Sequence, residues 1–184
     1  MSNFDDTADV DGFLNKMGQA FTPQMEVFGA RFPVLASEET RVVTILEDDG
    51  PIPRGEYGFI EFYCNDIKCD CRRVQIRVCS ENHPPDNSWA GINFGWETEA
   101  FYRKWLRASN EDAKGITGAS LEPFASNSRY AGDFLRLFQT HLMTDQNYVD
   151  RLARHYQIFK QSLKKPSGLK QLGRLGGGRR KRRR

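Results

Sequence analysis

Apolar and polar positions alternate along the middle of the chain with a period of two, which is typical of half-buried β-strands. In residues 73–79 three aliphatic side chains share one face, and Gln75 and Arg77 lie on the other. Alternation, β-branched residues and aromatic residues together predict strands at residues 41–47, 57–63, 73–79 and 89–95. Short connections between the last three favour an antiparallel meander of three to four strands.

After Trp96 the apolar spacing changes to three and four, which is the period of an amphipathic helix. Helices are predicted at residues 97–106, 134–142 and 148–163, with a shorter one at 13–21. Thr144 followed by Asp145 is a helix start signal for the last of the long helices. The predicted fold class is therefore α+β, an antiparallel meander packed against C-terminal α-helices.

Residues 97–128 carry two further predictions, one for a buried helix face and one for a loop. The helix at 97–106 is expected to bury a stripe of apolar side chains, namely Ala100, Phe101, Trp105 and Leu106. Residues 107–128 are polar and rich in glycine, so we expect a long loop there.

The length of 184 residues and the 39% hydrophobic content are sufficient for one domain with a core. We expect a disordered acidic leader at residues 1–12, one α+β domain at 13–163 and a flexible basic tail at 164–184. No stretch approaches the roughly 20 apolar residues of a membrane-spanning helix. The first residues also lack a secretion signal, so the expected location is the reducing cytoplasm, with no membrane partner.

The formal net charge of +3 hides two regions of opposite charge. Residues 1–159 hold 16 basic and 24 acidic residues, whereas residues 160–184 hold 11 basic residues and no acid. The chain ends in six consecutive cations, Arg179, Arg180, Lys181, Arg182, Arg183 and Arg184. Such a run favours contact with DNA, RNA or the ribosome through phosphates. Pairing with the acidic body and simple solubilisation are the alternatives.

Three of the four cysteines, Cys64, Cys69 and Cys71, lie between two predicted strands, so one hairpin turn presents three thiols. This spacing is typical of metal ligands, and zinc is the leading candidate, with an Fe–S cluster as another possibility. Two other interpretations remain open. The thiols are either reduced and metal-free, or redox-active because neighbouring cations favour thiolate.

The geometry of a strand limits the choice of a fourth metal ligand. Cys79 and His83 lie beyond a strand that carries the chain roughly 27 Å from Cys71, at about 3.3 Å per residue. His155 is on the apolar face of the last helix, so we predict it as the fourth ligand, with an ordinary core histidine as the alternative. His141 adjoins its helix's apolar face only loosely and is a weaker candidate.

The string YCNDIKCDCRRV at residues 63–74, followed by RVQIRV, INFGWE, FYRKWL and RHYQIFK, resembles a family of uncharacterised bacterial proteins with a C-x4-C-D-C-R-R core. The resemblance covers residues 57–163. It implies a bacterial cytosolic origin, and it carries over Cys64, Cys69, Cys71 and His155 as functional positions without an activity.

The sequence contains no phosphate-binding loop, dinucleotide fingerprint, zinc-protease helix or nucleophile elbow. The predicted function is therefore a zinc-binding, non-enzymatic module with a polybasic tail. The alternatives are a metal-dependent enzyme with an open zinc site and a thiol redox protein. A closed site of three cysteines and one histidine favours a structural metal, and three ligands plus solvent favour catalysis.

Overall fold

The computed structural model describes residues 25–47, 50–81, 83–107 and 110–164. The predicted leader, the helix at 13–21 and the tail from residue 165 lie outside these ranges. The strands are β1 (Met25–Val27), β2 (Arg41–Ile45), β3 (Gly55–Cys64), β4 (Arg73–Cys79), β5 (Ala90–Gly95) and β6 (Gly118–Leu121). The α+β class and the antiparallel sheet are confirmed, with six strands in place of three to four.

The sheet has the order β1-β3-β4-β5-β6, and β2 also pairs with β3. All these pairings are antiparallel. Strand β3 is ten residues long, and its outer edge is shared, since β2 pairs with Gly55–Phe59 and β1 with residues 62–64. The chain between β1 and β2 therefore leaves this edge and returns to it, with two short helices in between.

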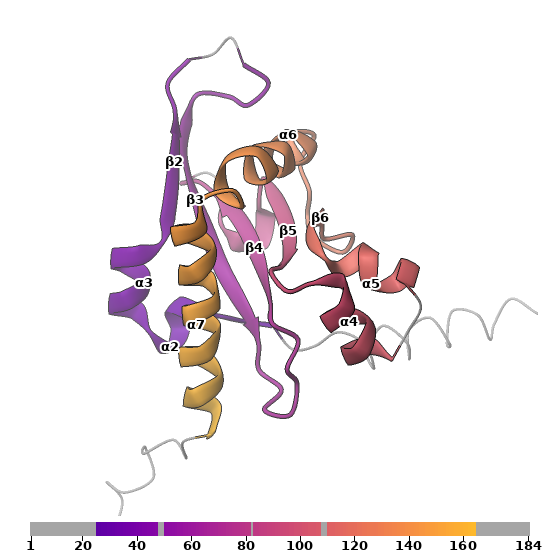
Figure 1. The fold of residues 1–184 in the computed structure, drawn as a ribbon. Coiled ribbons are helices and arrows are strands. Elements are labelled where there is room, and N and C mark those ends of the chain that lie inside the picture. Colours follow the sequence, from indigo (N-terminus) through magenta and orange to yellow (C-terminus); the bar gives the residue numbers. More distant parts are fainter. Residues whose placement is uncertain (1–24, 48–49, 82, 108–109, 165–184) are drawn as a thin grey trace, which may run out of the picture.

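The helices are α2 (Phe28–Arg31), α3 (Pro33–Glu39), α4 (Glu99–Leu106), α5 (Asn110–Ile116), α6 (Ala131–Leu137) and α7 (Gln146–Lys164), with a 3-10 turn, η1 (Pro85–Asn87), and a π-helical turn, η2 (Phe138–Leu142), after α6. Figure 1 shows α6 and α7 lying across one face of the sheet, while α4 and α5 lie beside its β5–β6 end. Within the described residues, no helix is both long and apolar enough to cross a bilayer.

The hydrophobic core lies between the sheet and the C-terminal helices. Phe59, Ile76 and Ile92 face it from three adjacent strands and are fully buried. Phe138 and Phe159 face it from the helices and are equally buried. Burial of each such side chain contributes roughly 1.5–3 kcal/mol, so this layer supplies much of the stability of the fold.

Helix α7 was the clearest prediction from the sequence, and it is confirmed. Asp145 caps it, because the Asp145 Oδ1 accepts hydrogen bonds from the backbone N–H of Asn147 at 3.0 Å and of Tyr148 at 3.4 Å. The buried face of the helix consists of Tyr148, Leu152, His155, Tyr156 and Phe159.

Two predictions for residues 97–128 are wrong. The predicted loop contains helix α5 and strand β6. In α4 the buried side chain is Tyr102, which is fully enclosed, while the predicted stripe is only half-buried or exposed. The Tyr102 hydroxyl donates to the Arg72 carbonyl at 2.8 Å, and this bond turns α4 so that Tyr102 packs on the end of β5.

A substitution at Gly95, the last residue of β5, tests the close packing of Tyr102 and Ile116 on this strand. A Cβ added there would lie 2.5 Å from the Ile116 carbonyl oxygen and 2.6 Å from the Tyr102 hydroxyl. We expect Gly95→Ala to lower the free energy of unfolding in urea by about 1–3 kcal/mol because the backbone at Ile116 must move. Gly58→Ala, in β3, is the matched control, since its Cβ meets nothing closer than 3.6 Å. Equal stability of the two variants would contradict the prediction.

Candidate metal centre

The three clustered cysteines lie at the turn between β3 and β4. Cys64 is the last residue of β3, and the turn of residues 65–72 returns the chain to β4. Asp66 shapes the turn, because its carbonyl accepts the Cys69 N–H at 3.1 Å and its Oδ1 accepts the Lys68 N–H at 2.8 Å. These local bonds fold Cys69 back toward the end of the strand.

The turn brings the three sulfur atoms together, as the sequence predicted. The Sγ atoms of Cys64, Cys69 and Cys71 all lie within 4.8 Å of one another. Sulfurs bound to a tetrahedral zinc at 2.3 Å stand about 3.8 Å apart, so separations of no more than 4.8 Å are compatible with one shared ion. Cys64 and Cys71 are buried and Cys69 is half-buried, and all three are free thiols.

The three thiols strongly affect one another's ionisation. Hydrogen bonds from Cys69 and Cys71 lower the pKa of Cys64, since they stabilise a thiolate there. The same bonds, together with burial, raise the pKa of Cys69 and Cys71. A divalent ion at this position would favour the deprotonated form of all three, because each sulfur binds a metal as a thiolate.

Helix α7 is joined to this turn by two side chains. The Lys160 Nζ donates to the Asp66 carbonyl at 2.6 Å and to the Cys64 carbonyl at 3.4 Å. The Tyr156 hydroxyl donates to the Asp70 Oδ1 at 3.2 Å. The Lys160 ammonium also lowers the pKa of Cys64 through its charge. The turn is thus fixed to the helical layer as well as to the sheet.

Arg72, directly after the last cysteine, has a left-handed backbone with φ of 47°. Its guanidinium forms ion pairs with Asp70 at 3.1 Å and with Glu97 at 3.0 Å, and lies 4.6 Å from the centre of the Phe101 ring. These partners offset the backbone strain, which is of order 1 kcal/mol for a residue with a Cβ. This left-handed residue lies between Cys71 and the first residue of β4.

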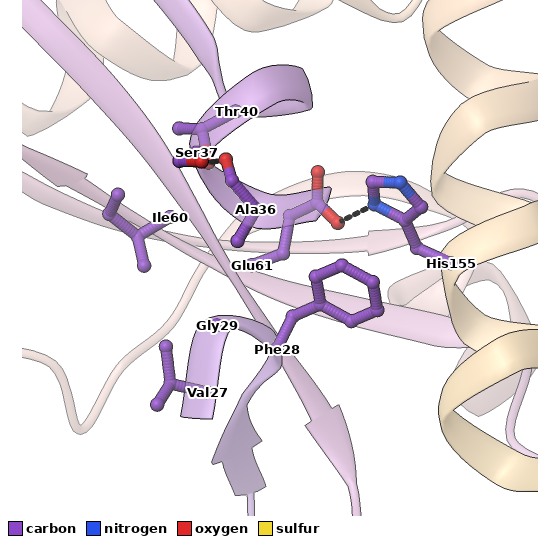
Figure 2. A pocket seen from close by; sticks show the side chains of 9 residues that line it. All are labelled: Val27, Phe28, Gly29, Ala36, Ser37, Thr40, Ile60, Glu61 and His155. Carbon is purple, nitrogen blue, oxygen red and sulfur yellow. Dashed lines mark hydrogen bonds and ion pairs between the residues drawn. The ribbon is translucent and has the colours of Figure 1, made fainter. Parts of the chain in front are cut away.

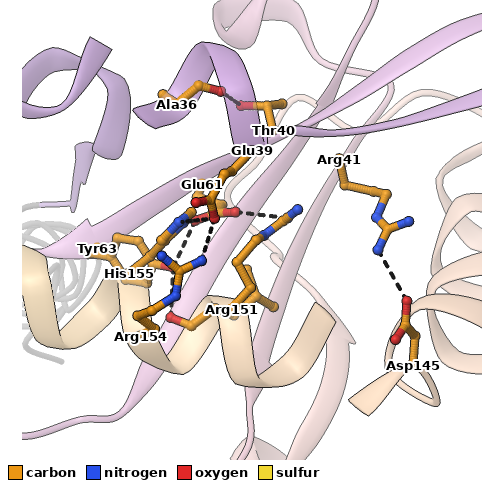
Figure 3. A network of polar contacts seen from close by, with 11 residues as sticks. Ala36, Glu39, Thr40, Arg41, Glu61, Tyr63, Asp145, Arg151, Arg154 and His155 are labelled. Carbon is orange, nitrogen blue, oxygen red and sulfur yellow. Dashed lines mark hydrogen bonds and ion pairs between the residues drawn. The ribbon is translucent and has the colours of Figure 1, made fainter. Parts of the chain in front are cut away.

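The prediction that His155 completes the metal site is wrong. His155 is buried, but its Nδ1 lies 2.7 Å from the Glu61 Oε2 and its Nε2 lies 3.0 Å from the Glu39 Oε2 (Figure 3). Both ring nitrogens therefore have partners other than the thiols, and among the described residues the group of potential metal ligands contains only the three cysteines. The environment of His155 is instead that of a buried core histidine, which was the alternative prediction.

The network around His155 joins α3, β3 and α7. Glu61 is only 6% exposed, and it also accepts hydrogen bonds from the Tyr63 hydroxyl at 2.9 Å and from Arg151 at 3.2 Å. Arg154 contacts Glu39, and this hydrogen bond is the main cause that lowers the pKa of Glu39. The sequence could have indicated this network, because the alternation of residues in β3 places the Glu61 carboxylate on the same face as the buried aromatic residues.

The other histidines and Cys79 lie elsewhere. Cys79 pairs with Gly58 at the opposite end of the hairpin, as predicted. The His83 ring lies 4.0 Å from the Trp89 ring, and the His141 Nδ1 is 2.7 Å from the Thr140 hydroxyl. None of these residues joins the three-thiol group.

A separate pocket of about 240 Å³ opens where β1 and β2 diverge along β3. Figure 2 shows Glu61 and His155 at one side of it, beside the Phe28 ring, which stacks on the imidazole at 4.3 Å. Small side chains of α3 form the other wall. Because its two ionisable groups are already paired with each other, the pocket is mainly a small apolar cavity.

We expect His155→Gln to destabilise the protein and to leave the three-thiol group in place. The substitution removes the imidazole from the buried Glu61 carboxylate, and loss of a hydrogen bond to a charged group costs about 1.5–3 kcal/mol. Urea unfolding measures this loss, and metal analysis of the folded fraction measures zinc content. Glu39→Gln, at the more exposed end of the network, is the milder companion variant. A folded His155→Gln protein that fails to retain zinc would restore His155 as a ligand.

No protein-family model, curated protein or solved structure matches the chain. The family resemblance of the YCNDIKCDCRRV segment thus stays a prediction, and the function is inferred from the site itself.

Proposed function

We propose that Cys64, Cys69 and Cys71 bind one zinc ion and that the protein is a zinc-binding module. The observation that carries this proposal is the gathering of three sulfurs from a single turn within 4.8 Å. Clustered thiolates prefer soft or borderline ions, and zinc is the usual one. An Fe–S cluster needs four such ligands as a rule, and the fourth cysteine lies at the other end of β4.

The ion would stabilise the end of the β3–β4 hairpin. In the apo protein the turn holds three competing sulfurs next to buried aromatic side chains, with Cys64 only 1% exposed. Zinc converts this unfavourable cluster into three metal bonds and fixes the ends of both strands. Binding therefore adds to the free energy of folding.

We also propose that the basic segment Arg179–Arg184 contacts DNA, RNA or the ribosome. The support is its charge, since six adjacent cations release counterions from nucleic-acid phosphates. The acidic residues of 1–159 would repel such a partner, so the tail is the part of the chain suited to this contact. This role is separate from the metal site and is tested separately.

A metal-dependent enzyme with an open zinc site is the second candidate. One observation favours it over a closed structural site, namely that His155 is bound to Glu61 and Glu39 and so leaves three sulfur ligands. Three protein ligands with a free position are typical of catalytic zinc.

The zinc proposal predicts about one zinc per chain in protein purified under reducing conditions, measured by plasma emission spectroscopy. Cys69→Ser removes the half-exposed ligand and should lower zinc content to a minor fraction and the thermal midpoint with it. Cys79→Ser is the matched control, because Cys79 lies at the far end of the hairpin and should leave the zinc content unchanged. Metal-free wild-type protein that cannot be loaded with zinc would refute the proposal.

The nucleic-acid proposal predicts salt-dependent binding to duplex DNA and to single-stranded RNA. Full-length protein should bind with a slope in log affinity against log salt of about −0.7 to −0.9 per phosphate contacted. A variant ending at residue 165 should lose most of this binding at physiological salt. Fluorescence anisotropy with labelled oligonucleotides measures both. Equal binding by the two proteins would exclude the tail as the contact.

A further inference from the structure

Zinc takes four ligands in most protein sites, whereas the turn supplies three. The whole chain has four cysteines and three histidines, and the four of these residues outside the cluster are placed elsewhere, as described above. Neither cysteine nor histidine occurs in residues 1–24 or 165–184. No further cysteine or histidine is therefore left to complete the site.

The nearest carboxylates already have other partners. The Asp66 Oδ1 accepts the Lys68 N–H at 2.8 Å. Asp70 is paired with Arg72 and accepts the Tyr156 hydroxyl at 3.2 Å. Across the described ranges, neither carboxylate falls within the group of ligand atoms that the three sulfurs form.

The cluster is enclosed on one side and accessible on the other. Cys64 and Cys71 are 1% and 7% exposed, while Cys69 is half-buried and Ile67, at the tip of the turn, is 50% exposed. Solvent therefore reaches the three-thiol group at Cys69. A free coordination position of a bound ion would be filled from solvent there.

The charges next to the cluster favour an anionic donor at that position. The Lys160 ammonium lies on the carbonyls of the turn, 2.6 Å from that of Asp66. Arg73 begins β4 two residues after Cys71, and its Nε is buried without a hydrogen-bond partner. Because a thiolate is both anionic and soft, it matches zinc and these two cations better than a neutral donor does.

We propose that the fourth position of the metal at Cys64, Cys69 and Cys71 is exchangeable and binds a thiolate from outside the chain. This inference rests on the proposed zinc site. In the exchange the incoming thiol releases its proton to solvent, and its sulfur replaces the solvent ligand, with no change in oxidation state. The site would then recognise a small thiol in its deprotonated form.

Cobalt-substituted full-length protein tests the inference, because the d–d and sulfur-to-cobalt absorption bands of Co²⁺ report the number and type of its ligands. The protein is reduced with a non-thiol reductant, loaded with cobalt and titrated with 2-mercaptoethanol. We expect the sulfur-to-cobalt band to grow by roughly a third and to saturate, as three sulfur ligands become four. Bands that thiol leaves unchanged, or that vanish because thiol extracts the ion, would overturn the inference.

Variants separate the possible outcomes. Asp66→Asn and Asp70→Asn should leave the cobalt spectrum before thiol addition unchanged, and an altered spectrum in either would mean that a carboxylate closes the site, against the inference. Arg73→Met should weaken thiol affinity several-fold, whereas Lys114→Met, which removes an exposed cation of α5, should not. Equal thiol affinity of these two variants would contradict the charge argument that selects a thiolate. Protein that binds neither cobalt nor zinc would refute the proposed function itself, as distinct from the exchangeable position.

Discussion

The antiparallel pairing of β3 with β4 is the constraint on which the other features depend. Its register runs from Gly58 opposite Cys79 to Phe62 opposite Gln75. A hairpin in this register has one turn, and that turn must bring the end of β3 and the start of β4 together. The same pairing keeps the fourth cysteine at the distant end of β4. Strand register thus places the three cysteines in one turn, and contacts from Lys160 and Tyr156 of α7 hold that turn.

Helix α7 connects this hairpin to the rest of the domain in two chemically different ways. Near its C-terminal end, Lys160 binds the carbonyls of the thiol turn. His155 and Arg151, which precede Lys160 by five and nine residues, bind a carboxylate buried in the middle of β3. Aromatic side chains fill the space between these contacts, such as Tyr63 and Phe159, whose ring centres are 5.7 Å apart. The thiol cluster and the charged network are therefore separate sites along one helix–strand interface.

Periodicity in the sequence was sufficient to predict the strands of the meander, helix α7 and the cluster of three cysteines. It was insufficient for β1 and β6, because strands of three and four residues carry too few positions to show a period. The error at His155 has a different origin. Periodicity places this histidine on the buried face, but only the three-dimensional structure shows that Glu61 and Glu39 reach its two nitrogens before any sulfur does. Burial could be predicted, and the choice among buried partners could not.

The left-handed backbone of Arg72 affects how the thiol turn meets an ion. Its side chain is held by carboxylates on both sides and its carbonyl by the Tyr102 hydroxyl, so the end of the turn is already immobilised by the protein. Little conformational entropy is left to be lost when the sulfurs close around a metal. A turn held in this way would limit how far its sulfurs can move apart. The range of ions that fit between them would then depend on an arginine outside the three-thiol group.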